Sequence, residues 1–147
     1  MKRLGLFIAA ITLGVGLSAN AIAADQDAPR KLVAPIRGEA VVELTPPQTK
    51  LGGDEVVTMI RIKNASKGPI AGFRVQETWF KGNDPLSGDE YRHPRPFQVG
   101  EVIDVRLSVP RGRVTGARDP RYQFSHANGT IKTVPVKTLP APPKPTK

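Results

Sequence analysis

The residues best suited to chemistry are four arginines that fall within eleven positions of the stretch VPRGRVTGARDPRYQF. A guanidinium group binds phosphate or carboxylate with two parallel hydrogen bonds, which lysine cannot do. Two glycines in the same stretch allow backbone N–H groups to approach an anion closely. The pattern predicts an anion-facing or partner-facing surface made by Arg111, Arg113, Arg118 and Arg121.

The alternative is a solvated loop, because runs of charged residues usually only keep a surface soluble. Arg92 and Arg95 extend the candidate set, since residues 92–121 hold seven arginines and no lysine. Nucleic acid is not the partner we expect, because an exported protein seldom meets DNA and only 5% of the residues are aromatic. An acidic envelope protein or an anionic envelope polymer fits the charge better.

Aromatic residues offer a second candidate surface, because tryptophan and tyrosine are favoured where proteins recognise partners. Trp79, Tyr91 and Phe97 flank the segment 81–98, which we expect to be a long loop. The alternative is that these rings close the ends of the hydrophobic core. Trp79 and Phe80 are neighbours in an expected strand, so one of them must point away from the core.

Catalysis and metal binding have little support in the sequence. The chain has no cysteine and two histidines, His93 and His126, which stand in no paired metal-binding motif. We expect His93 to be exposed and His126 to lie near a strand end. No GxSxG motif accompanies the serines. We predict no catalytic residue, no metal and no cofactor, and rank a small enzyme or metal-binding protein third.

The first residues, MKRLGLFIAAITLGVGLSANAIAAD, have the three parts of a secretory signal peptide. A short basic start precedes an apolar run of 14 residues, Leu4 to Leu17, and small residues follow at Ala21 and Ala23. A membrane-spanning helix needs roughly 20 apolar residues. We therefore expect residues 1–23 to be cleaved, leaving no membrane span and a protein exported to the bacterial periplasm or cell surface.

The expected mature chain is large enough for one domain. Removing 23 of 147 residues leaves 124, and losing Lys2 and Arg3 changes the net charge from +9 to +7. We predict a flexible leader over 24–36, a folded domain over 37–137 and a disordered proline-rich tail over 138–147. The domain is expected to be a monomer or a weak oligomer.

The folded part has a period-2 pattern that indicates strands with one buried face. Asn128-Gly129 predicts a hairpin turn. The fold class we predict is all-β, a single immunoglobulin-like antiparallel β-sandwich of about six to eight strands. The expected strands lie at 38–45, 55–64, 70–81 and 101–110, with a hairpin over 122–136.

Glu77 interrupts this pattern, because it is in phase with the apolar residues Phe73, Val75 and Trp79. A buried unpaired carboxylate is costly. Either the strand bulges, or the carboxylate reaches the end of the sandwich, or it meets an arginine. We favour the second possibility.

The stretch IRIKNASKGPIAGFRVQETWFKGNDPLSG, followed by FQVGEVIDVRLSVP, resembles FxLYD-type and related immunoglobulin-like domains of exported bacterial proteins. An Asn-x-Ser turn, a strand opening with Ile-x-Gly, and Val-Gly-Glu before an alternating strand carry the resemblance over roughly residues 38–126. The Phe-x-Leu-Tyr-Asp motif itself is absent. The resemblance implies a sandwich fold and no catalytic motif.

Two functions follow as hypotheses. The first is a non-catalytic, extracytoplasmic interaction module that binds a partner through its arginine-rich face or a strand edge. The second is a binding protein for an anionic envelope polymer. The features that separate these two functions are the salt dependence of binding and its need for the arginines.

Overall fold

The computed structural model describes residues 32–144, which contain eight strands and one short 3₁₀ helix. Within these residues no helix is long and apolar enough to cross a membrane. The elements in chain order are β1 (Ala40–Leu44), β2 (Gln48–Gly52), β3 (Glu55–Asn64), β4 (Arg74–Lys81), β5 (Asp84–Arg92), β6 (Val102–Pro110), η1 (Arg111–Val114), β7 (Arg118–His126) and β8 (Gly129–Pro135).

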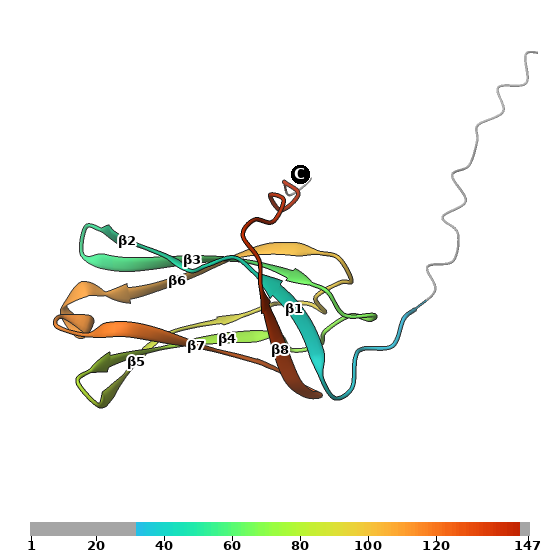
Figure 1. Ribbon diagram of the computed structural model, residues 1–147, viewed down its shortest axis with the longest axis horizontal. Helices are drawn as coiled ribbons and strands as arrows, with labels where there is room; N and C mark the ends of the chain where they lie inside the picture. The colour runs from blue at the N-terminus through green and yellow to red at the C-terminus, as the bar shows by residue number, and fades with distance from the viewer. Residues whose placement is uncertain (1–31, 145–147) are drawn as a thin grey trace, which may run out of the picture. The chain divides into compact units, whose positions relative to one another are not determined.

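The strands form two layers of one curled sheet (Figure 1). One layer holds β3 with β6 on one side and both β2 and β1 on the other, and the second layer holds β4 between β5 and β7. β8 starts beside β7 and continues beside β1, which joins the layers. The predicted all-β, immunoglobulin-like sandwich is confirmed. It is not purely antiparallel, because β1 and β8 run parallel.

The core lies between the layers, where alternate residues of each strand meet. In β6 the side chains of Val105, Leu107 and Val109 are buried, while Asp104 and Arg106 face solvent, as the period-2 pattern predicts. The buried cluster is completed by residues of the other strands and loops, including Ala40, Val42, Ile60, Ile62, Ile70, Phe73, Val75 and Phe97.

Asn64 fixes the turn that leads from β3 toward β4. Its side chain is fully buried, and Nδ2 donates to the carbonyl oxygens of Phe97 at 2.8 Å and Gly68 at 3.1 Å. Its Oδ1 accepts from the Ser66 backbone N–H at 2.8 Å. Three hydrogen bonds therefore satisfy a polar side chain that burial would otherwise make costly.

Two strands were not expected from the sequence. All five residues of β2 are exposed, so this strand has no apolar alternation to detect. β5 contains Pro85 and Gly88, which indicate a loop, and it occupies half of the expected loop 81–98. β5 is a sheet-edge strand paired only with β4, where proline is tolerated.

All eight strands lie within the predicted domain limits, 37–137. The structure also describes residues 32–36 of the predicted leader and 138–144 of the predicted tail. Residues 1–31, including the predicted signal peptide, lie outside the described residues. Of the predicted leader, Ile36 donates its N–H to the Pro69 carbonyl at 2.8 Å. In the predicted tail, the Leu139 carbonyl accepts a hydrogen bond from Arg61 at 3.3 Å.

Candidate functional site

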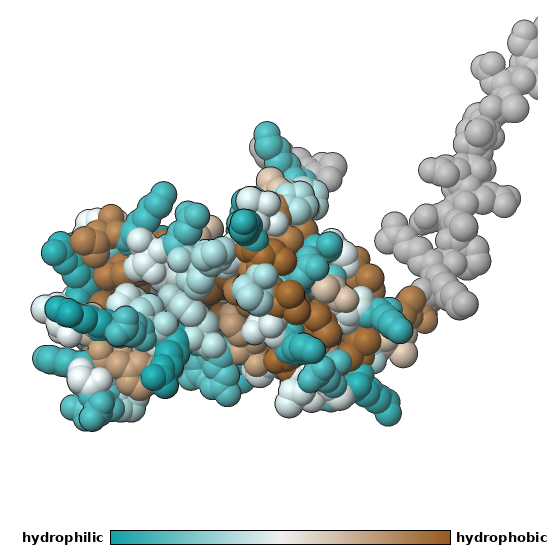
Figure 2. All heavy atoms as spheres, in the orientation of Figure 1, coloured by the Kyte–Doolittle hydropathy of each residue, from teal (hydrophilic) through white to brown (hydrophobic). Residues whose placement is uncertain are grey.

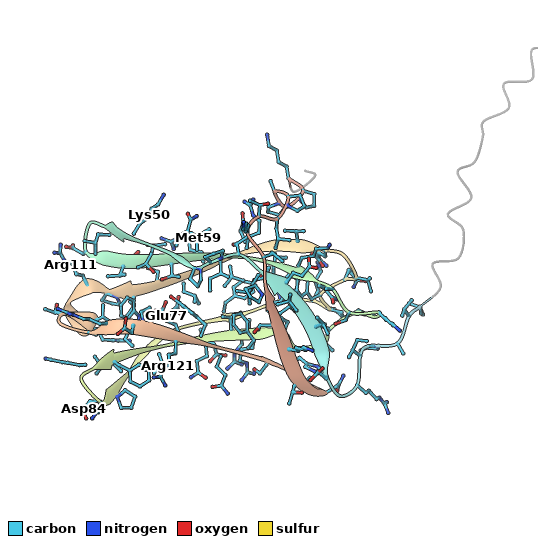
Figure 3. All side chains as sticks on the ribbon, viewed as in Figure 1. Lys50, Met59, Glu77, Asp84, Arg111 and Arg121 are labelled. Carbon is cyan, nitrogen blue, oxygen red and sulfur yellow. The ribbon has the colours of Figure 1, made fainter. Side chains whose placement is uncertain are left out.

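η1 and the start of β7 lie at one end of the domain, on the left in Figure 1, and η1 and β7 carry the four arginines, of which Figure 3 labels Arg111 and Arg121. Arg111 and Arg113 lie in η1, which follows β6 without a break, and Arg118 and Arg121 lie in β7. The Arg111 N–H donates to the Asp54 carbonyl at 2.7 Å, which fixes η1 to the β2–β3 turn. This surface, made by the side chains of Arg111, Arg113, Arg118 and Arg121, is called the arginine end below.

A β-bulge in β7 shapes this end. Thr78 pairs with Arg121 and Phe80 pairs with Arg118, so β7 holds one residue more than β4 between these pairs. Asp119 lies in this interval with a φ of 50°, a left-handed conformation that aspartate tolerates better than most residues. The guanidinium of Arg121 lies over the ring of Phe80, 4.8 Å from its centroid, in a cation–π contact.

The arginine end carries positive charge that the domain does not neutralise. All four arginines are exposed, and none of them takes part in a salt bridge among residues 32–144. Lys81 adds a charge here, because its Cε lies 3.8 Å from the position a Cβ on Gly116 would occupy. Hydrophilic side chains project around this end of the domain, with apolar surface between them (Figure 2).

A hollow of about 330 Å³ opens beside Arg111. Its apolar lining comes from four elements and the loop after η1, and its polar lining is the Arg111 side chain with two threonines. A volume of this size lies at the lower end of the range for ligand pockets. The apolar lining residues are Leu51, Val56, Trp79, Val114 and Ala117, and the threonines are Thr49 and Thr115.

Behind the hollow, Trp79 holds a buried carboxyl group. Trp79 is 7% exposed, and its indole Nε1 donates to Glu77 Oε1 at 2.5 Å. Glu77 is 1% exposed, and burial raises the pKa of its carboxyl above the ordinary value. The expectation that Glu77 reaches the end of the sandwich is wrong. Glu77 keeps the inward phase of Phe73, Val75 and Trp79, so its carboxyl stays inside. The β4–β5 register shifts opposite Glu77, where β5 holds one residue more than β4.

Arg92 and Arg95 do not join the arginine end. Arg92 binds Glu90, and Arg95 makes two hydrogen bonds to the carboxylate of Glu101, one of them 3.0 Å long. Both arginines are thus paired within the domain. Arg92 pairs with Arg74 of β4, whereas Arg118 pairs with Phe80 of the same strand. Arg74 and Phe80 are six residues apart, so the two arginines are separated by about 20 Å along β4.

The other predicted aromatic residues belong to the fold rather than to a surface. Phe97 is fully buried against Phe73, with ring centroids 5.1 Å apart, so it has no surface to offer a partner. Tyr91 is half-buried, and its hydroxyl lies 2.8 Å from His93 Nδ1. The His93 side chain is 6% exposed, so the expectation of an exposed histidine is wrong, and burial lowers its pKa.

His126 uses both ring nitrogens to hold the β7–β8 turn. Nε2 donates to the carbonyl oxygens of Gly38 at 2.9 Å and Thr130 at 3.0 Å, and Nδ1 accepts from the Asn128 N–H at 3.3 Å. Among the described residues no group of three or more histidine, cysteine, aspartate or glutamate side chains is placed to hold a metal ion.

The sequence did not point to Leu51 and left open whether Trp79 or Phe80 faces outward. The neighbouring aromatic pair indicated that either Trp79 or Phe80 faces outward, and the structure places Phe80 there, under Arg121. Leu51 lies in a strand without alternation and carries no signal of its own.

No known protein-family model matches this sequence, and no curated protein matches it. The resemblance to FxLYD-type domains therefore stays a prediction. The class of protein that the fold defines is the immunoglobulin-like β-sandwich.

Proposed function

We propose that the domain is a non-catalytic interaction module of an exported bacterial protein, and that it binds an anionic partner through the arginine end. The observation that carries the proposal is the set of four exposed guanidinium groups without a salt bridge among the described residues. By contrast, Arg92 and Arg95 have carboxylate partners. Unpaired charge on one end of a small domain attracts a partner of opposite charge and speeds its association.

A protein partner is favoured over a polymer by the hollow beside Arg111. A simple polyanion needs only positive charge, whereas a hollow lined by Leu51, Trp79 and Val114 also suits an apolar group. An anionic envelope polymer is the second candidate, because four clustered guanidinium groups also suit repeated phosphates or carboxylates. The bacterial envelope is where the predicted signal peptide would deliver the mature chain.

The test is co-sedimentation of the mature chain, residues 24–147, with isolated bacterial envelopes at increasing salt concentration. A variant in which all four arginines are alanine is compared with the wild type. We expect wild-type binding to weaken as salt rises, and the variant to lose at least about tenfold in affinity. Protease treatment of the envelopes separates the two candidates, because it removes a protein partner and leaves a polymer.

The matched control removes the same charge elsewhere. Arg37, Lys67, Lys132 and Lys144 are exposed and make no salt bridge among the described residues. Replacing these four by alanine lowers the net charge equally and is expected to reduce binding much less. Equal loss in both variants would mean that net charge acts without a site, and no binding by the wild type would overturn the proposal.

A further inference from the structure

One side of the sandwich next to the arginine end is not closed by a strand. β2 pairs only with β3, and its backbone has no other hydrogen bond among the described residues. β8 pairs with β7 only at Ser125 and His126, and then continues along β1 (Figure 1). The outer edge of β2 and the edge of β7 from residue 118 to 124 therefore both lack a partner strand.

The inner face of β2 is uncovered at the same place. Thr49 and Leu51 stand opposite Thr58 and Val56, so all four side chains lie on the inner face of this layer. Thr58 and Val56 are 1% and 6% exposed, whereas Leu51 is 67% exposed. Thr49 and Leu51 line the hollow together with Trp79. The open edge and the apolar hollow are thus parts of one surface.

We propose that this surface binds an extended acidic segment of a partner protein, which adds a strand to the outer edge of β2. The inference rests on the proposed function and names the chemistry of the partner. An added strand satisfies the unpaired N–H and C=O groups of β2, a known mode of peptide recognition. Side chains two positions apart in a strand point to the same face, so an apolar side chain in the hollow has acidic side chains two positions away near Arg111, which lines the hollow.

Three observations select a peptide over other anions. A strand edge recognises the amide N–H and C=O groups of an extended peptide backbone, which a sugar–phosphate or polyphosphate backbone does not present at strand spacing. The hollow has the volume for one large apolar side chain, and Arg111 lies on its lining. The unpaired charge of Arg113, Arg118 and Arg121 is complementary to an acidic segment.

Tryptophan fluorescence can report binding at this site, because Trp79 is the only tryptophan and lies in the lining of the hollow. Three synthetic peptides serve as probes for the mature chain. The first carries one leucine with a glutamate two positions before it and two positions after it and serine between them, the second has serine in place of leucine, and the third is the leucine peptide N-methylated at alternate residues. All three have the same charge, and the third cannot complete a strand ladder.

We expect the leucine peptide to shift Trp79 fluorescence and to bind at least about tenfold more tightly than the serine peptide. N-methylation on the pairing edge is expected to lower affinity about tenfold or more. Leu51→Asn is expected to weaken binding of the leucine peptide and leave the serine peptide unchanged. Val99→Asn, at an apolar residue 52% exposed in the loop before β6, is the matched control.

The outcomes separate this inference from the proposed function. Equal, salt-sensitive binding of the leucine and serine peptides would overturn the inference and leave the arginine end as an anion site. No binding of either peptide, with no binding of envelopes, would overturn both. Full affinity of the N-methylated peptide would refute strand addition. Self-association of the domain that the leucine peptide reverses would assign the surface to a second copy and overturn the proposal as stated.

Discussion

Replacing Glu77 with glutamine is expected to remove a loss of stability that the wild-type domain undergoes as the pH rises. Glu77 is 1% exposed, its Oε1 accepts a hydrogen bond from the Trp79 indole, and its Oε2 has no partner among the described residues. Burial, the largest effect, raises the pKa of this carboxyl, and the hydrogen bond from Trp79 offsets only part of the rise. The folded state therefore keeps a proton that the unfolded chain releases.

The sign and size follow from proton linkage. Below the ordinary glutamate pKa of 4.5, Glu77 is protonated in both states and contributes its full stability. As the pH rises above that value, the unfolded chain loses its proton first, so the free energy of unfolding falls by about 1.4 kcal/mol per pH unit. The fall ends when the pH passes the raised pKa of the folded state. The charge of Asp89 also raises the pKa of Glu77. Tyr122 is the other ionisable neighbour, and the charge of Glu77 contributes to its raised pKa.

The assay is urea unfolding of the wild type and Glu77→Gln from about pH 4 to about pH 8, followed by circular dichroism. Glutamine keeps the size and the acceptor oxygen but cannot ionise, so its advantage over the wild type should grow with pH. Glu39→Gln, at an exposed glutamate, is the control and should show no such growth. A difference between Glu77→Gln and the wild type that is the same at every pH would refute the reasoning.

Three further substitutions, two of them compared with a control substitution, test the fold by the same urea assay. Asn64→Ala should lower the free energy of unfolding by about 3 kcal/mol, because three buried hydrogen bonds are lost, and a loss below about 1 kcal/mol would contradict this. Gly88→Ala should cost about 1–3 kcal/mol, since its Cβ would lie 2.8 Å from the Glu77 carbonyl oxygen. Gly112→Ala, which meets nothing within 4 Å, should be nearly neutral, and equal effects would refute the steric argument. Asp119→Val should cost about 1–2 kcal/mol because φ is 50°, whereas Asp119→Gly should be nearly neutral; similar costs would exclude backbone strain there.

The sequence by itself determined the strands in which apolar and polar residues alternate. β3 has the predicted bounds, and β6 begins one residue after its predicted start, because each strand covers one face of the core and apolar residues recur with period 2. Asn128-Gly129 correctly located the β7–β8 hairpin, but the two turn residues are Ala127 and Asn128, and Gly129 already pairs with His126. These features depend on residues close together in the chain, so local pattern was sufficient to find them.

Tertiary structure decided which charged residues are free. Seven arginines between residues 92 and 121 are alike in the sequence, yet Arg92 and Arg95 meet glutamates while Arg111 does not. Arg106 meets Glu55 because β6 pairs with β3, whereas Arg92 and Arg95 meet glutamates only two and six residues away in the chain. No local spacing rule shows that Arg106 meets Glu55.

Tertiary structure also decided the open side of the sandwich. β2 was not predicted because all its residues are exposed. Its inner-face residues Thr49 and Leu51 are uncovered because β8 leaves β7 and crosses to β1. The hollow lined by Leu51 and Trp79 lies where β8 has crossed to β1 and no strand joins the edge of β2 to the edge of β7. A strand's alternation records the burial of its own faces, whereas an uncovered edge depends on where a distant strand goes.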